Sequence, residues 1–180
     1  MPEESPSDRF WAFSLALYEK PGVAPALLEL QDRLGLDVNL LLFCCWAGVE
    51  GRALSPADVA AVEAVTQPWQ VEIIRPLRAL RRRLKSGFAA LPADAVAAFR
   101  KRLADLEIEG EHIAQAAMSP LLPPGTPSDA LRGASLVSAN LLTYFTHSRL
   151  PIGPPETAAL TTILRACCPE ADLTELGSGA

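Results

Sequence analysis

Long apolar runs are missing from this chain of 180 residues. Two stretches without a charged side chain, residues 38–49 and 133–146, are 12 and 14 residues long. A membrane-spanning helix needs about 20 apolar residues, so neither stretch is expected to cross a bilayer. The first twelve residues are acidic where a secretory signal would be basic. These absences predict a cytoplasmic protein without a membrane partner.

Basic residues and histidines are also scarce. Lys and Arg number 16 against 21 Asp and Glu, which gives a net charge of -5 and makes nucleic acid an unlikely partner. The two histidines leave little for acid–base catalysis at neutral pH. The chain contains no G-x-S-x-G, P-loop or G-x-G-x-x-G motif. We therefore predict no catalytic residue and no cofactor, and the sequence leans away from an enzyme.

The four cysteines occur as two adjacent pairs, at residues 44–45 and 167–168. Neighbouring cysteines rarely bridge each other because a disulfide has a specific geometry, and zinc ligands usually stand at least two residues apart. The interpretation we favour is small buried side chains in a reducing compartment. A soft-metal or redox site built from both pairs, or a stray cross-link, is the alternative.

Alanine and leucine dominate the composition, whereas β-branched residues are sparse. Both residues lose little side-chain entropy in a helix, and no segment is typical of a strand. We predict an all-α, compact single-domain helical bundle of about seven to eight helices over residues 1–180, with disordered ends at 1–5 and 170–180. The expected helices cover residues 6–19, 23–34, 38–49, 56–65, 66–86, 93–118, 128–147 and 156–167.

Several helix ends follow from capping chemistry. Gly35 suits the position after a helix, and Asp37 suits the cap of the next one. Ser55 followed by proline marks another start, and Ser128 a later one. Pro76 lies inside a helical pattern, so we expect a kink near residues 72–76 or a split there.

The two uncharged helices carry amides that burial alone does not explain. The helix over 38–49 is apolar on all sides except at Asn39, which is typical of a buried central helix. Asn39 and Asn140 could bond backbone or bridge helices. Alternatively, they orient a small ligand in a pocket between the two helices, with Trp46 and Tyr144 as its walls.

A basic stripe covers residues 75–85, which hold six positive charges and no negative one. Arg75, Arg78, Arg82 and Lys85 share one helical face. The first three are candidate ligands for an anionic small molecule, an acidic partner, a lipid surface or a nucleic-acid phosphate. The alternative is a solvated face that pairs with the acidic helix further along the chain.

That acidic helix carries Glu107 and Glu111 four residues apart, and therefore on one face. The interpretation we favour is ion pairing with the basic stripe, and a site for a divalent metal is the alternative. Glu109 and His112 have the spacing of a di-iron ligand pair. A second such pair is missing, because Tyr144 stands three residues before His147.

Three blocks of sequence resemble one known family. Residues 10–48, 69–85 and 103–115 are similar to a family of proteobacterial conserved hypothetical proteins, a domain of unknown function. The first block is the most specific, with Leu-Tyr, Pro-Gly-Val, Leu-Gln and Asp-Val-Asn-Leu-Leu-Leu before a tryptophan. The resemblance implies a small all-helical cytoplasmic protein of bacteria and brings no activity, cofactor or catalytic residue. The last 60 residues have no counterpart in it.

These observations favour a non-enzymatic binding or regulatory module for a partner protein or an anionic small ligand. The sequence is also compatible with a homo-oligomer. The alternative is a helical enzyme that acts on an anionic or phosphorylated small molecule. In that case Glu107 and Glu111 would hold a divalent metal, and Arg75, Arg78 and Arg82 would clamp the anion. The enzyme requires both carboxylates to face a cavity with the arginines at its rim.

Overall fold

Helices make up all the regular structure in residues 5–124 and 133–169, which the computed structural model describes. The all-α prediction is therefore confirmed for these residues. No helix among them is both long enough and apolar enough to span a bilayer. The elements in chain order are α1 (Pro6–Tyr18), α2 (Val23–Leu34), α3 (Val38–Val49), α4 (Pro56–Trp69), a π-helical segment (Gln70–Ile74), α5 (Arg75–Leu84), α6 (Ala93–Met118), a 3-10 turn (Ser119–Leu121), α7 (Ala134–His147) and α8 (Pro154–Cys167).

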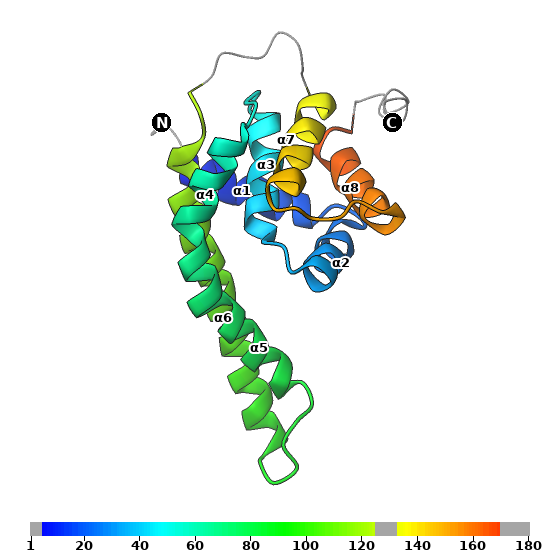
Figure 1. The fold of residues 1–180 in the computed structure, drawn as a ribbon. Helices are drawn as coiled ribbons and strands as arrows, with labels where there is room; N and C mark the ends of the chain where they lie inside the picture. The colour runs from blue at the N-terminus through cyan, green and yellow to red at the C-terminus, as the bar shows by residue number, and fades with distance from the viewer. Residues whose placement is uncertain (1–4, 125–132, 170–180) are drawn as a thin grey trace.

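The body of the molecule is built around α3. Every residue from Val38 to Gly48 is buried in this helix, because α7 packs along one side while α1, α6 and α8 approach it from others (Figure 1). Trp46 stacks on Phe10 with ring centroids 4.8 Å apart, and Phe43 meets both rings edge-on. The uncharged stretch is thus the centre of the core, as its pattern predicted.

A long helical hairpin extends from this body. Helices α4 and α5 form one continuous rod through the π segment, so the eight α-helices of the described residues make seven rods. The rod pairs with α6, and their distal halves project away from the other helices (Figure 1). We call α5, α6 and the turn between them the arm.

The rod corrects one prediction and confirms another. A break at residues 65–67 was expected, but α4 continues through Pro68 to Trp69. Its buried face, with Val62 and Thr66, packs on α6 and α7, and this packing outweighs the local cost of proline. The irregularity expected near 72–76 is present as the π segment, in which the Arg75 N–H donates to the carbonyl of Gln70 five residues back. The wider turn accommodates Pro76, which cannot donate to the carbonyl of Glu72.

Capping fixes the ends that position the site. The Asp37 carboxylate accepts hydrogen bonds from the backbone N–H groups of Asn39 and Leu40, and Gly35 has a positive φ of 65° after α2. Ser5 caps α1, where its hydroxyl accepts a hydrogen bond from the Asp8 N–H. The predicted cap at Ser128 and the predicted disorder at 170–180 lie outside the described residues.

Candidate functional site

A cavity of about 340 Å³ lies between the arm and the body. Five helices contribute to it, so it forms only when the hairpin packs against α1, α2 and α3. We call it the central cavity. Its lining residues are Trp11, Ser14, Leu15 and Tyr18 of α1, Leu28 and Gln31 of α2, Asn39 and Leu42 of α3, Arg78, Arg81 and Arg82 of α5, and Glu107, Ile108, Glu111 and Gln115 of α6.

Charged side chains form one wall. The Arg78 guanidinium donates through Nε to Glu107 Oε1 at 2.7 Å, through Nη2 to Glu111 Oε1 at 2.6 Å and through Nη1 to Gln31 Oε1 at 2.6 Å. Arg81 donates to both oxygens of Glu107. Glu107 therefore has both oxygens occupied by guanidinium groups. This saturation makes the buried carboxylate stable in its charged form.

Amides and a hydroxyl form a second wall. The Ser14 hydroxyl donates to Gln115 Oε1 at 3.0 Å, and Gln115 Nε2 donates to Asn39 Oδ1 at 2.8 Å. All three side chains are buried, so each bond replaces one that water would otherwise make. These hydrogen bonds explain why an amide stands at the start of the otherwise apolar α3.

The rim of the cavity is apolar. Leu15, Leu28 and Ile108 are each about half-exposed although they line it. Trp11 lies beside them and stacks on His112, with ring centroids 4.4 Å apart. A ligand in the cavity would therefore meet polar groups inside and apolar side chains at the mouth.

The two glutamates have opposite electrostatic environments. Burial raises the pKa of Glu107, but hydrogen bonds from Arg81 and Arg78 outweigh it, and the net pKa lies below the ordinary value. Burial raises the pKa of Glu111, and Arg78 only partly offsets this increase. Burial and then the charge of Glu111 raise the pKa of Tyr18, whose phenol stays neutral.

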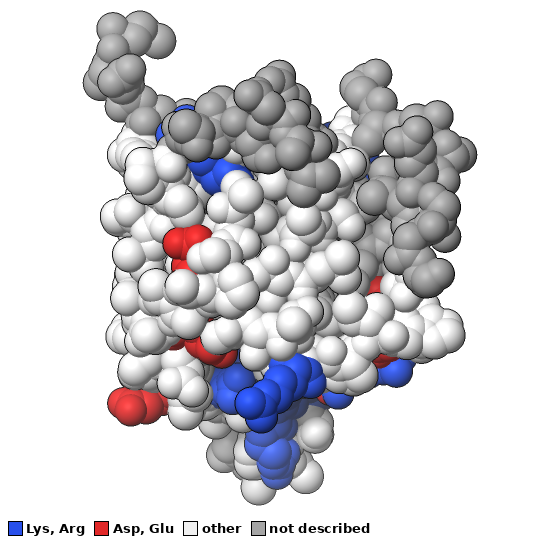
Figure 2. Space-filling view, turned by 45° about the horizontal axis from the view of Figure 1, so that its top comes forward, with Lys and Arg blue, Asp and Glu red and all other residues white. Residues whose placement is uncertain are grey.

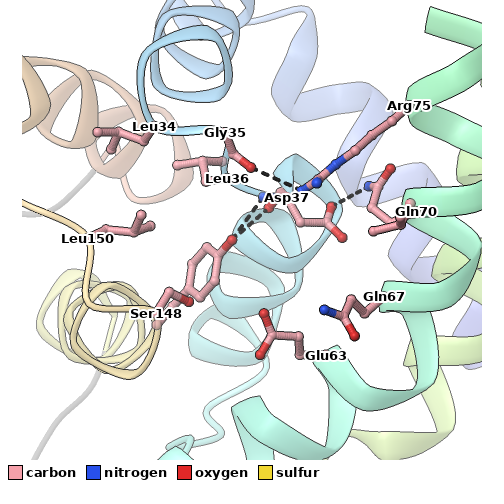
Figure 3. Close-up of a pocket in the computed structure, with 12 residues that line it drawn as sticks. Leu34, Gly35, Leu36, Asp37, Glu63, Gln67, Gln70, Arg75, Ser148 and Leu150 are labelled. Atoms are coloured by element: carbon pink, nitrogen blue, oxygen red, sulfur yellow. Dashed lines mark hydrogen bonds between the residues drawn. The ribbon is translucent and has the colours of Figure 1, made fainter.

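A second, smaller cavity of about 140 Å³ lies at the N-terminus of α3 (Figure 3). Asp37 Oδ1 accepts a hydrogen bond from Gln70 Nε2 at 2.8 Å, and burial raises the pKa of this carboxyl. The Tyr144 hydroxyl accepts from the Asp37 N–H at 3.0 Å and donates to its carbonyl at 3.3 Å. Arg75 donates to the carbonyl of Gly35 at 3.3 Å. These bonds tie the rod and α7 to the start of α3.

The structure divides the sequence-predicted site residues among three places. Those brought together at the central cavity are Asn39, Arg78, Arg82, Glu107 and Glu111. Arg75 and Tyr144 line the smaller cavity instead. Trp46 and Asn140 line neither of these two cavities.

Asn140 bridges backbone between helices. Its Oδ1 accepts from the N–H of Leu54 at 2.8 Å, and its Nδ2 donates to the carbonyls of Cys44 and Arg52. Gly48 lies against Val137, where an added Cβ would come within 2.7 Å of the Val137 Cα. Close contact of α3 with α7 therefore favours the bridging interpretation over a ligand pocket between these helices.

Sequence reasoning missed Ser14, Tyr18, Gln31, Arg81 and Gln115 as cavity residues. One signal was available for Ser14, because it shares a helical face with the buried Phe10 and Leu17. A polar residue on an apolar face is a candidate for a buried network. Gln115, beside the buried Ala114 and near Met118, gives the same signal.

The cysteines lie away from both cavities. Cys44 and Cys45 are buried, Cys167 and Cys168 are partly buried, and all four are free thiols. Burial raises the pKa of Cys44. No group of three or more His, Cys, Asp or Glu side chains with a metal-binding arrangement occurs in residues 5–124 and 133–169.

One family model matches more than half of the chain. The model of a family described as "Protein of unknown function (DUF2390)" matches residues 9–118. The matched range contains every residue that lines the central cavity and the whole arm. No curated protein and no solved structure matches the chain.

Proposed function

For this chain, which belongs to the DUF2390 family of proteins of unknown function, we propose a binding role centred on the central cavity. The ligand we propose is a small amphipathic anion, with a carboxylate or phosphate group on an apolar body. Its anionic group bonds Arg82 and Arg81, and its apolar body lies along Leu15, Leu28 and Ile108. The protein is then a non-enzymatic binding or regulatory module.

The observation that carries this proposal is the unequal accessibility of the charges. Arg82 pairs with Asp32 at 2.6 Å, and the two side chains are 49% and 52% exposed. Glu107 is only 7% exposed, and its oxygens already hold two guanidinium groups. An exposed ion pair contributes about 0–1 kcal/mol, so an incoming anion can replace Asp32 at little cost. An incoming cation finds no comparably free carboxylate on this wall.

Size and lining support a small ligand. Ligand pockets usually enclose about 300–1,000 Å³ and combine apolar walls with a few orienting polar groups. The volume of about 340 Å³ lies at the lower end of that range. Three apolar side chains at the mouth would remove a hydrocarbon body from water, and each buried methylene contributes about 0.8 kcal/mol.

The enzyme alternative is not favoured by the contacts of its proposed metal ligands. Both glutamates do line a cavity with arginines around it, which is the geometry that the alternative requires. However, Glu107 and Glu111 accept hydrogen bonds from Arg78 and Arg81, so a divalent cation would have to displace guanidinium groups. We therefore propose that these carboxylates hold the arginine wall in place.

The sequence also predicts the cellular location of the protein. We infer a bacterial, cytoplasmic setting, in keeping with four free thiols and the family resemblance of the opening block. Cysteines without a disulfide suit such a compartment. Fractionation of a host that expresses the native chain would test this placement.

Thermal melts with straight-chain carboxylates and alkyl phosphates test the ligand class. A ligand at 100 times its Kd adds about 2.7 kcal/mol of stability, which raises Tm by about 5–10 °C in a chain of this size. Each added methylene should tighten binding about three- to fourfold, up to the length that the cavity accommodates. Neutral alcohols and trimethylammonium salts of equal chain length should give much smaller shifts.

Two variants of adjacent arginines make a matched control. Arg82→Ala removes the exposed cation at the cavity and should abolish most of the shift. Arg83→Ala should leave the shift intact, because that guanidinium lies over the Phe88 ring at 4.6 Å and does not line the cavity. Equal shifts in both variants, or none with any anion in the wild type, would contradict the proposal.

A further inference from the structure

A line of exposed apolar side chains follows the arm on α6. Phe99, Leu106 and Ile113 are spaced seven residues apart, which places them on one helical face. They are 44%, 50% and 50% exposed, whereas Leu103 and Gly110 beside them are buried against the rod. We call these three residues the apolar stripe.

The rod that pairs with α6 also has exposed apolar side chains. Leu80 of α5 and Ile73 of the π segment are also seven residues apart and more than one-third exposed. A two-helix hairpin that leaves apolar side chains in water lacks the packing partner that four-helix bundles provide. From the stripe and the charges around it, we propose that the arm is a dimer interface, in which a second copy of this chain packs antiparallel to the first and completes a four-helix bundle.

The orientation follows from the distribution of charge. Residues 75–102 hold nine basic residues and one acidic residue, whereas the rest of the chain holds seven basic and twenty acidic. In Figure 2 most of the Lys and Arg side chains in view gather at the lower end of the molecule, where the arm lies. A parallel pair would place these two basic regions together. An antiparallel pair places each one beside the acidic half of the other α6, where Asp105 and Glu109 are exposed.

The register follows from the middle of α6. This helix runs from Ala93 to Met118, so a two-fold axis near Leu106 lets the two copies overlap along its full length of about 39 Å. Phe99 then faces Ile113 of the second copy, and Leu106 faces its own counterpart. Arg102 comes within one residue of Glu109 of the second copy. Both of these charged residues are exposed and lie between the members of the apolar stripe.

Sedimentation velocity over a concentration series tests the proposal. We expect the wild type to change from monomer to dimer as concentration rises through the micromolar range. Leu106→Glu places two like charges at the axis and should raise the dimer dissociation constant at least about tenfold. Leu142→Glu changes an equally exposed leucine of α7 and should leave the constant unchanged. A wild type that stays monomeric, or a dimer that tolerates Leu106→Glu, overturns the proposal.

Charge reversal tests the antiparallel register and does not depend on a core change. Arg102→Glu and Glu109→Arg should each weaken the dimer, because each places two like-charged pairs across the interface. The double variant restores opposite charges and should recover most of the wild-type constant. Additive weakening in the double variant would rule out this register. Circular dichroism of each variant confirms that it is folded, and ligand shifts measured on monomeric variants keep this test separate from the cavity proposal.

Discussion

At the scale of single residues, Arg78 holds the central cavity together. Its guanidinium bonds one side chain of α2 and two of α6, and it is only 15% exposed. An isolated buried carboxylate is costly, and Arg78 is the cation that bonds both Glu107 and Glu111, while Arg81 bonds Glu107 as well. Arg82, four residues on, makes only an exposed pair and leaves its charge available to a ligand.

Because Arg78 bonds three side chains and Arg82 makes an exposed pair, substituting them should change the free energy of unfolding by different amounts. Arg78→Met should lower the free energy of unfolding by about 2–4 kcal/mol, because Glu107, Glu111 and Gln31 lose a partly buried partner. Arg82→Met should cost less than about 1 kcal/mol, as exposed pairs do. Urea denaturation of the two variants measures both values. Equal losses would show that the Arg78 network does not have this structural role.

Substituting Glu107 and Glu111 with glutamine should change the stability of the protein at pH 7 in opposite directions. The pKa of Glu111 is raised above the ordinary 4.5, so its charge destabilises the fold once the pH exceeds that value. Glu111→Gln should therefore stabilise the protein at pH 7, with a gain that disappears in acid. The pKa of Glu107 is lowered, so its charge stabilises the fold above 4.5, and that contribution is lost as the pH falls. Glu107→Gln should destabilise at pH 7 and matter less in acid.

Denaturation at a series of pH values measures both profiles. Asp105→Gln is a suitable control, since that carboxylate is exposed and, within the part of the chain that the structure describes, pairs with Lys101 on its own helix. Its profile should follow the wild type closely. Two glutamate variants that shift stability in the same direction at pH 7 would contradict the electrostatic account.

At the scale of helices, two glycines set how closely neighbours approach. A Cβ on Gly48 would meet the backbone of Val137 at 2.7 Å, so α3 and α7 would have to separate. A Cβ on Gly110 would clash with the Ile74 Cδ1, at 2.6 Å, and would be in ordinary contact with Trp69 Nε1 at 3.8 Å. The end of the Ile74 side chain can rotate. Both glycines therefore allow close helix contact, but the neighbour of Gly110 can move aside more easily than the neighbour of Gly48.

Substituting each glycine with alanine should show which of the two helix contacts is less tolerant of an added methyl group. Gly48→Ala should cost more than about 2 kcal/mol, because backbone cannot move aside cheaply. Gly110→Ala should cost less, since alanine favours the helix by about 1 kcal/mol and offsets part of the clash. Adding Ile74→Val to Gly110→Ala should recover stability by removing the colliding methyl group. Chemical denaturation would refute this ranking if Gly110→Ala proved the more costly change.

The helix ends show how far the sequence predicts this fold. The predicted bounds of α2, α3 and α6 agree with the structure, because caps such as Asp37 and breakers such as Gly35 act locally. The expected break near Pro68 failed because packing on α6 and α7 decides whether that helix continues. Tertiary contacts of this kind leave no local signal.

The candidate site shows the same limit. Arg78, Arg82, Glu107 and Glu111 were identifiable as opposed charges on two helices, whereas their common cavity depends on how the hairpin meets α1 and α2. The pairing of Ser14 with Gln115 joins residues 101 positions apart. No spacing rule predicts such a contact from one sequence. Polar residues on buried helical faces were the only available indication.

At the scale of the whole molecule, the arm has two sides with different surroundings. One side closes the central cavity against the body with Arg78, Arg82 and Ile108. Elsewhere on the arm the apolar stripe of Phe99, Leu106 and Ile113 is open to water. Ligand binding and self-association would therefore involve different residues of α6. A variant in one surface should leave the other intact.

Crystallography with 8-bromooctanoate tests the binding proposal most directly. Anomalous scattering from bromine locates the end of the apolar body, and the remaining density locates the carboxylate. We predict a bromine peak beside Leu15, Leu28 and Ile108, with the carboxylate bonded to Arg82, and no such peak in Arg82→Ala crystals. A peak elsewhere on the protein, or an unchanged peak in Arg82→Ala, would contradict an anion site in the central cavity.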